Sequence, residues 1–234
     1  LADRLEVSRQ SVSKWEMDAA YPRIDKLIQM CTVFGVSTDE LLKEEISFEE
    51  KEKPAVKHTS ENHYFGTDGF RGEANIDLTA EQAFKVGRFL GWYYANPLSG
   101  CRDRNYRPKF VIGKDTRRSS YMLEYSIAAG ITASGGDTYM LHVTTTPSVS
   151  YVTRQDDFDC GIMISASHNP YYDNGIKLIN GNGEKMDEET ISLVEDYIDG
   201  KLEVFGQKWE EVPFAHREHI GCTVDYVSGR NRYM

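Results

Sequence analysis

Residues 161–177 read GIMISASHNPYYDNGIK, and the change from apolar to polar residues within this stretch decides the fold. The apolar run at 161–164, rich in β-branched residues, is typical of a buried strand. Small polar residues and Pro170 follow at once, and because they cannot continue a central strand, the chain must turn there. Residues 173–175 give a second turn signal, after which 176–179 predict another strand. The stretch therefore predicts two strands joined by an exposed polar loop.

This loop carries candidate catalytic side chains. In open α/β sheets ligands bind beyond the carboxyl ends of strands, which is where Ser165, Ser167 and His168 fall. Lys177 follows on the next predicted strand, so we expect a serine, a histidine and a lysine on two edges that face each other. Short motifs also match by chance, so a plain polar connection between strands is an equally good interpretation of this loop taken alone.

The composition is that of an ordinary globular protein. The 234 residues are 40% hydrophobic and 27% charged, which suits one or two domains with real cores. The net charge of −10 disfavours a dominant nucleic-acid-binding function, because phosphate contacts need an excess of Lys and Arg. Since the sequence shows neither a signal peptide nor a membrane-spanning run, we expect a cytoplasmic protein without a membrane partner. The widely spaced cysteines predict reduced, packed thiols rather than a zinc site or disulfides.

Residues 1–43 predict a small helical module. Ser8 is a candidate N-cap for a helix over 9–15. The segment LADRLEVSRQSVSKWE resembles the helix-turn-helix of phage-repressor-like regulators, whose second helix enters the major groove of DNA. The resemblance implies four candidate DNA contacts: Arg9, Gln10, Ser11 and Lys14. The expected first helix is missing and acidic residues slightly outnumber basic ones, so a helical module without DNA affinity of its own stays an alternative.

A change of composition separates this module from the rest of the chain. Residues 44–62 are highly charged, lack apolar periodicity and contain Pro54, which predicts a linker. From residue 63 onward, apolar runs predict strands over 109–113, 138–143 and 160–164. Capping signals predict helices that begin near Thr79, Ser119 or Ser120, Thr146 and Asp187. Strands and helices that alternate at this spacing predict a three-layer α/β fold over 63–234, with a mostly parallel sheet and flanking helices.

Residues 64–72, YFGTDGFRG, place three glycines around Asp68 and Arg71. Glycines at this density allow positive φ and close backbone approach, as a loop that wraps a phosphate needs. Arg71 offers a planar, permanently charged fork for phosphate oxygens. For this loop alone, an ordinary glycine-rich turn with a solvated Arg71 is the favoured interpretation.

Three segments, FGTDGFRG, GKDTRRSS and SASHNPYYDNGIK, occur in this order. Together they resemble the first domain of the α-D-phosphohexomutases, and most closely that of the phosphoglucosamine mutases, over residues 63–234. The resemblance implies that Ser167 carries a phosphoryl group, through which it takes part in binding Mg²⁺ together with three aspartates of another domain. It also implies that Arg71 and Lys177 lie near the transferring phosphoryl group, with Lys177 assisting proton transfer.

Neighbouring polar residues are given lesser roles. We expect His168 and Asn169 to fix the geometry of the loop rather than to act chemically. Ser165 also has a hydroxyl group and lies close to Ser167. It does not occupy the position that matches the phosphoryl-carrying serine of the family. Asp68 and Asp115 are interpreted as loop hydrogen-bond acceptors rather than metal ligands.

The resemblance implies interconversion of glucosamine 6-phosphate and glucosamine 1-phosphate, through a phosphoserine and a sugar bisphosphate. The DGDxDR-type metal loop of the second domain, and the loops of later domains, do not occur in the sequence. We therefore expect a chain that stops before the metal-binding domain and is inactive by itself. Two alternatives stay open. The first is a phosphomannomutase or phosphoglucomutase of the same superfamily, and the second is a helix-turn-helix transcriptional regulator with a phosphosugar-sensing domain.

Overall fold

The computed structural model of the chain describes residues 2, 5, 7–16, 22–34, 63–96 and 106–233. These residues belong to two compact units, one within residues 1–55 and one within 56–234. The predicted linker at 44–62 lies outside the described residues.

The first unit contains two described helices, α1 (Arg9–Glu16) and α2 (Ile24–Phe34). Ser8 caps α1 as predicted, because its Oγ accepts a hydrogen bond from the Ser11 amide at 3.1 Å. Leu5 is fully buried, and Lys26 of α2 donates to the Leu5 carbonyl at 2.7 Å. The segment before α1 therefore packs against α2.

The second unit is built on one seven-stranded sheet with the order β1-β2-β6-β5-β3-β4-β9. Parallel neighbours form its core: β5 (Cys160–Ile164), β3 (Lys109–Lys114), β4 (Asp137–Val143) and β9 (Thr223–Asp225). An antiparallel edge completes it: β6 (Asp173–Asn180), β2 (Gly69–Glu73) and β1 (Phe65–Gly66). The predicted α/β fold with a mostly parallel central sheet is confirmed.

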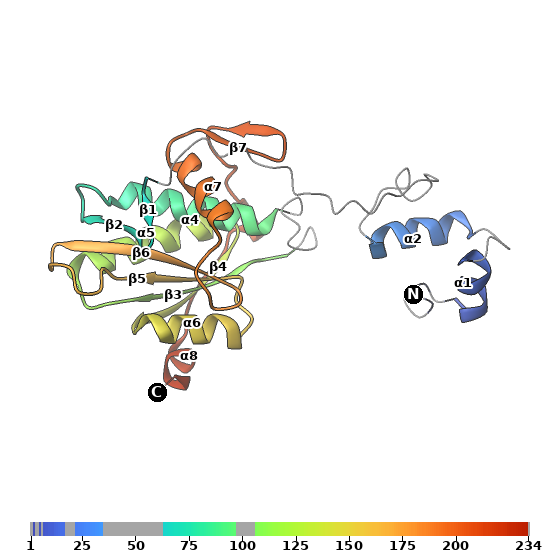
Figure 1. The fold of residues 1–234 in the computed structure, drawn as a ribbon, viewed down its shortest axis with the longest axis horizontal. Coiled ribbons are helices and arrows are strands. Elements are labelled where there is room, and N and C mark those ends of the chain that lie inside the picture. The colour runs from blue at the N-terminus through green and yellow to red at the C-terminus, as the bar shows by residue number, and fades with distance from the viewer. Residues whose placement is uncertain are drawn as a thin grey trace. The chain divides into compact units, whose positions relative to one another are not determined.

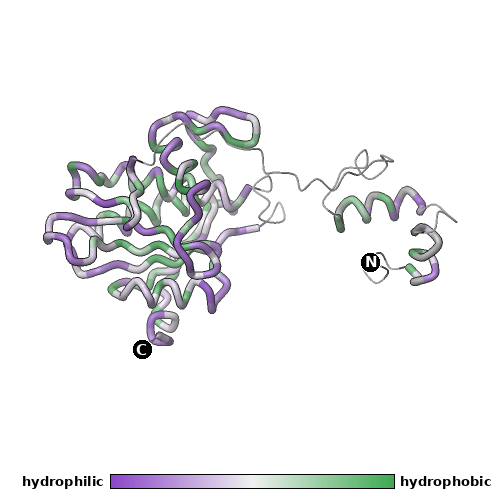
Figure 2. The backbone as a smooth tube through the Cα atoms, in the orientation of Figure 1, coloured by the Kyte–Doolittle hydropathy of each residue, from purple (hydrophilic) through white to green (hydrophobic). Residues whose placement is uncertain are grey.

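Helices cover both faces of this sheet (Figure 1). One face carries α4 (Ala80–Ala95), α5 (Arg118–Ala133) and α7 (Glu188–Ile198), and the other carries α6 (Thr146–Gln155) and α8 (Val227–Arg232). All five residues of β5 are buried, as a strand between two helical layers requires. The central strands are accordingly hydrophobic and their connecting loops hydrophilic (Figure 2). A small hairpin of β7 (Leu202–Val204) and β8 (Gln207–Trp209) and a 3₁₀ turn at Arg217–His219 complete the unit.

Capping residues mark two helix starts as predicted. Thr79 and Gln82 form a reciprocal capping box at the start of α4, and the Asp187 side chain accepts a hydrogen bond from the Thr190 amide at the start of α7. At α6 the N-cap is Thr145 rather than Thr146, and it makes no side-chain capping hydrogen bond.

Two predicted loops are strands in the structure. Residues 173–175 form the start of β6, where they pair with β2. Pairing with this neighbouring strand gives hydrogen-bond partners to backbone amides and carbonyls that a turn would leave without them. Residues 64–72 form the β1–β2 hairpin rather than a phosphate-wrapping loop. Gly69 has a φ of 91° after the turn, and a Cβ there would lie 2.4 Å from the Ile176 carbonyl oxygen. At Gly69, therefore, close packing of the hairpin on β6 accounts for the glycine.

The described cysteines, Cys31, Cys160 and Cys222, are free thiols. Burial raises the pKa of the Cys160 thiol, so this side chain is an inert part of the core. Cys222 is exposed just before β9, which departs from the prediction of packed thiols. Within the part of the chain that the structure describes, no helix has the length and apolar character needed to cross a membrane.

Candidate active site

Polar loops from three strands meet at one edge of the sheet. The Asp115 amide donates to the Ile164 carbonyl at 2.9 Å, and the Ser165 amide donates to the Gly175 carbonyl at 2.8 Å. The end of β5 is thereby tied to β3 on one side and to β6 on the other. Beyond this point Ser165 and Ala166 are still buried, whereas Ser167 is exposed. The serine loop, residues 165–170, therefore starts from a rigid base.

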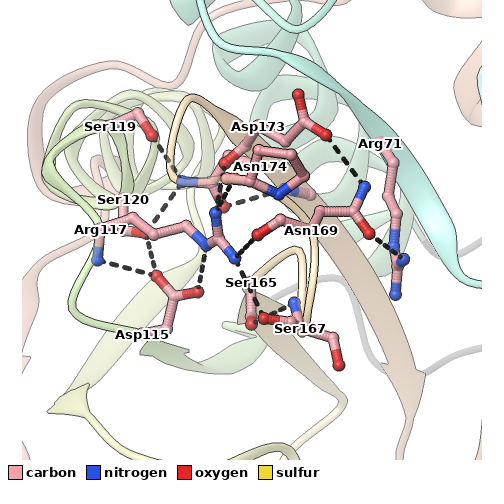
Figure 3. Close-up of polar contacts among 12 residues, drawn as sticks. Arg71, Asp115, Arg117, Ser119, Ser120, Ser165, Ser167, Asn169, Asp173 and Asn174 are labelled. Carbon is pink, nitrogen blue, oxygen red and sulfur yellow. Dashed lines mark hydrogen bonds and ion pairs between the residues drawn. The ribbon is translucent and has the colours of Figure 1, made fainter.

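Ser167 has a backbone held on both sides and a side chain left free. Its φ is 57°, in the left-handed region that costs a residue with a Cβ on the order of 1 kcal/mol. Its amide donates to Ser165 Oγ at 3.0 Å, and its carbonyl accepts from Arg117 Nη2 at 3.0 Å. No hydrogen bond to the Ser167 hydroxyl is found among the described residues. Figure 3 shows this hydroxyl directed away from the Arg117 network. The local contacts thus present the hydroxyl to solvent.

Arg117 is the centre of the contacts that hold the serine loop (Figure 3). Its guanidinium donates to the carbonyls of Ser167, Asn169 and Asp173 at 3.0, 2.9 and 3.1 Å, and also to that of Pro170. Its Nε donates to Asp115 at 2.9 Å. A planar fork with five donors suits this arrangement, and a lysine ammonium does not. Sequence reasoning missed this residue.

Asp115 and Asn174 connect the base of the loop to the start of α5. The Asp115 carboxylate accepts hydrogen bonds from the Arg117 amide at 3.0 Å and from Ser120 Oγ at 2.6 Å. The buried Asn174 side chain donates to Ser119 and Ser120 at 2.8 and 2.9 Å. These contacts give Asp115 the hydrogen-bonding part that the sequence predicts. The signal for Arg117 was present too, since an Asp-x-Arg directly after a strand falls at this edge of the sheet.

Arg71 reaches the serine loop through Asn169. It lies on β2 opposite Gly175, where the missing Cβ leaves room for the Arg71 side chain, since a Cβ would lie 3.0 Å from its Cγ. Its Nη1 donates to Asn169 Oδ1 at 3.2 Å, and its Nη2 lies 3.4 Å from Asp68. Asn169 in turn donates to Asp173 at 3.0 Å. The Arg71 Nε is buried and has no acceptor among the described residues.

Lys177 lies on the neighbouring part of β6, opposite Met163. It lines a cleft of about 230 Å³ together with Asp68 of the β1–β2 turn and Thr146 of α6. Ser167 does not line this cleft. The structure thus brings Arg71 to the serine loop directly, and it places Lys177 in an adjoining cleft to which Asp68 also belongs.

His168 and Asn169, which the sequence pairs as determinants of loop geometry, differ in the structure. Asn169 bonds to Arg71, Arg117 and Asp173 and fills that role. His168 is exposed, and within the described ranges it makes no hydrogen bond or ion pair. A part for His168 in the loop geometry therefore stays a prediction.

The candidate DNA contacts lie in the first unit. Gln10 is exposed, and Ser11 is half-buried with its hydroxyl 2.9 Å from that of Ser8. The side chains of Arg9 and Lys14 lie outside what the structure describes. Their contact with DNA stays a prediction.

Comparison with known families divides the chain at the same place. Residues 62–204 match the family described as phosphoglucomutase/phosphomannomutase, alpha/beta/alpha domain I. Residues 1–41 match a helix-turn-helix family.

Curated relatives match the second unit. The phosphoglucosamine mutases of Lachnospira eligens and Lachnoclostridium phytofermentans are 67% and 63% identical over 171 residues, which is 73% of this chain. The chain spans only 35% of the length of either relative.

Solved structures share the fold. A phosphoglucomutase/phosphomannomutase family protein from Burkholderia thailandensis superposes with a TM-score of 0.54 at 22% identity, over 71% of this chain and 33% of its own. A putative phosphomannomutase from Thermus thermophilus gives a TM-score of 0.51 at 23% identity, over 71% of this chain and 34% of its own.

Proposed function

The chain belongs to the phosphoglucomutase/phosphomannomutase family, and we propose that residues 63–233 form the phosphoryl-carrying domain of a phosphoglucosamine mutase. The relatives at 67% and 63% identity bear that name, which favours a hexosamine phosphate over mannose or glucose phosphates as substrate. A phosphomannomutase or phosphoglucomutase is the alternative within the same family.

The observation that carries the proposal is the presentation of Ser167. Both backbone polar groups of this residue are bonded to neighbours, its φ is held at 57°, and its hydroxyl is exposed. Strain of this kind persists where the surrounding contacts over-determine it, as they do at many active sites. An exposed hydroxyl on a rigid loop can carry a phosphoryl group and give it up without rearrangement of the backbone.

The proposed transfer balances without an added reactant. The bond between phosphorus and Ser167 Oγ breaks, a new bond forms between phosphorus and a sugar hydroxyl, and the proton of that hydroxyl passes to Ser167 Oγ. Arg71 stabilises negative charge on the phosphoryl oxygens, since its Nε has no acceptor among the described residues and its charge is permanent. Lys177 assists the movement of the proton.

Mg²⁺ would supply charge neutralisation to this transfer when it is bound. Ser167, through its phosphoryl group, is the ligand that we propose for it. Among the described residues no group of three or more His, Cys, Asp and Glu could hold a metal ion. The nearby carboxylates are already engaged: Asp115 with Arg117, Asp173 with Asn169, and Asp68 with Arg71. These residues do not fit a metal centre by themselves, and the steps above do not pass through one.

A domain graft tests the proposed function. Residues 63–233 would replace the corresponding segment of the Lachnospira eligens phosphoglucosamine mutase, to which they are 67% identical. We expect the graft to convert glucosamine 6-phosphate to glucosamine 1-phosphate at no less than about a tenth of the rate of the parent enzyme, because core substitutions that conserve volume are tolerated. A graft that folds, as judged by circular dichroism, and shows no turnover would contradict the proposal.

Lys177→Gln tests the role of the lysine in the same graft. The amide keeps most of the length and polarity of the side chain but cannot exchange a proton, so we expect kcat to fall by about 10²-fold with little change in KM. Lys185→Gln, another lysine that lines the same cleft, is the matched control and is expected to leave kcat within about threefold. Equal effects of both substitutions would show that Lys177 acts only through the charge of the cleft.

The helix-turn-helix match of residues 1–41 favours a second function, sequence-specific binding of DNA. In this proposal Arg9, Gln10, Ser11 and Lys14 contact DNA. The test is selection of bound sequences from a random duplex library by the whole chain, followed by mobility-shift titration. We expect Gln10→Ala to weaken binding to the selected duplex by about 1–3 kcal/mol, which is the cost of one lost bidentate base contact. Gln29→Ala, an exposed glutamine on α2, is the control. Recovery of no enriched sequence would rule this function out.

A further inference from the structure

A second hollow lies on the α6 face of the sheet, beyond the end of β4. Six residues line it: Val143, Thr144, Thr145, Ser148, Arg230 and Tyr233. This set contains hydroxyl groups and one guanidinium, and it contains no carboxylate. A lining with this balance of groups suits an anion.

The first turn of α6 brings the free amide of Ser148 to this hollow. The helix has ten residues, and its N-cap Thr145 makes no side-chain capping hydrogen bond. Pro147 contributes no amide, and Thr146 lines the Lys177 cleft rather than this hollow. Among the described residues no acceptor is found for the amide of Ser148, which does line the hollow. This unsatisfied amide and the positive end of the helix dipole together favour a negatively charged group here.

Ser148 supplies an independent sign of a missing partner. Its side chain is only 2% exposed, it lines the hollow, and its Oγ has no hydrogen-bond partner within the described part of the chain. A buried hydroxyl without a partner is uncommon and destabilising, and a bound acceptor would relieve that cost.

Arg230 of α8 completes the set with a charge. Arg230 is half-buried, and its guanidinium forms no ion pair with another described residue. Arg232, two residues later on the same helix, is instead paired with Asp156. Of these two arginines, the one that lines the hollow is therefore the one with a free guanidinium.

We propose that this hollow binds the phosphate group of a phosphate monoester. The amide and the hydroxyl of Ser148 and the Arg230 guanidinium would donate to the phosphate oxygens. The hollow measures about 510 Å³, which leaves room for an organic group beside the phosphate. The site lies at the end of β4 and uses neither Ser167 nor Arg71, so it does not depend on the proposed mutase function.

Titration of the whole chain, followed by the amide resonances of Thr145 and Ser148, which both line the hollow, in ¹H–¹⁵N spectra, tests the proposal. Two probes would be used at low ionic strength, inorganic phosphate and glucose 6-phosphate. We expect both probes to shift these two resonances, with Arg230→Gln weakening the affinity by about tenfold and Ser148→Ala by about threefold. The matched control Arg232→Gln removes a charge from the same helix and is expected to leave the affinity unchanged.

Further variants separate this site from the serine loop. Arg71→Gln and Ser167→Ala are expected to leave the Thr145 and Ser148 shifts intact. Tighter binding of glucose 6-phosphate than of inorganic phosphate would support a phosphate monoester as the ligand, whereas tighter binding of inorganic phosphate would overturn that assignment. Unshifted resonances would refute the site itself. An equal loss of affinity in Arg230→Gln and Arg232→Gln would also refute it, and so would a loss of affinity in Arg71→Gln.

Discussion

Ser167→Ala abolishes turnover in the grafted phosphoglucosamine mutase, by about 10⁴-fold or more, if this serine carries the phosphoryl group. The substitution removes the only atom of the residue that would bond to phosphorus. It leaves the backbone contacts of Ser167 with Ser165 and Arg117 in place, because these involve the amide and the carbonyl. We therefore expect unchanged stability in urea denaturation alongside the loss of activity.

Ser165→Ala is the matched control for this experiment. Ser165 Oγ accepts the Ser167 amide at 3.0 Å but is itself buried, so its loss should loosen the loop without removing a reacting atom. We expect a fall of about tenfold in kcat, which is the scale of one neutral hydrogen bond. Equal activities of Ser167→Ala and the unmodified graft would refute the assignment of the carrier, and so would a greater loss in Ser165→Ala.

Arg117→Lys has the second largest expected effect. Lysine keeps the positive charge but cannot donate to four carbonyls and a carboxylate at once. The serine loop therefore loses most of the hydrogen bonds that hold it in place. We expect kcat in the graft to fall by about 10²-fold, because a displaced nucleophile is no longer in attack geometry. Hydrogen exchange at the amides of residues 165–175 should accelerate in the chain itself, with little change in the central strands.

Arg118→Lys provides the comparison for Arg117→Lys. Arg118 is the adjacent residue, is exposed and makes no contact with the serine loop within the described residues. We expect its replacement to change neither kcat nor the exchange rates. If Arg117→Lys left the loop amides as protected as in the unmodified chain, Arg117 would not be what positions the loop.

The architecture was accessible from the sequence wherever burial alone decides the structure. The apolar run at 160–164 predicts β5, and the capping residues Thr79 and Asp187 predict the starts of α4 and α7. Periodicity and capping are local signals, so they need no knowledge of the neighbouring strands. The exposed Ser167 after a buried strand follows from the same local logic.

Pairing between distant segments was not accessible in this way. The sequence at 173–175 has the composition of a turn, yet it forms a strand because β2, about a hundred residues earlier, pairs with it. The Asp-x-Arg after β3 indicates that Arg117 lies at this edge of the sheet. That Arg117 holds the serine loop was not accessible, because its hydrogen bonds go to backbone carbonyls, which carry no sequence signature. The position of Lys177 in a separate cleft depends on the β1–β2 turn and on α6, two elements that no local pattern places together.

Mapping of phosphate on the grafted enzyme during turnover tests the central claim most directly. After incubation with glucosamine 6-phosphate and rapid quenching in acid, peptides that cover residues 161–177 would be sequenced by mass spectrometry. The presentation of Ser167 by Arg117 and Ser165 predicts phosphate on Ser167 and on no other residue of that stretch. Phosphate on Ser165, or an active graft that carries no phosphate in that stretch, would contradict it.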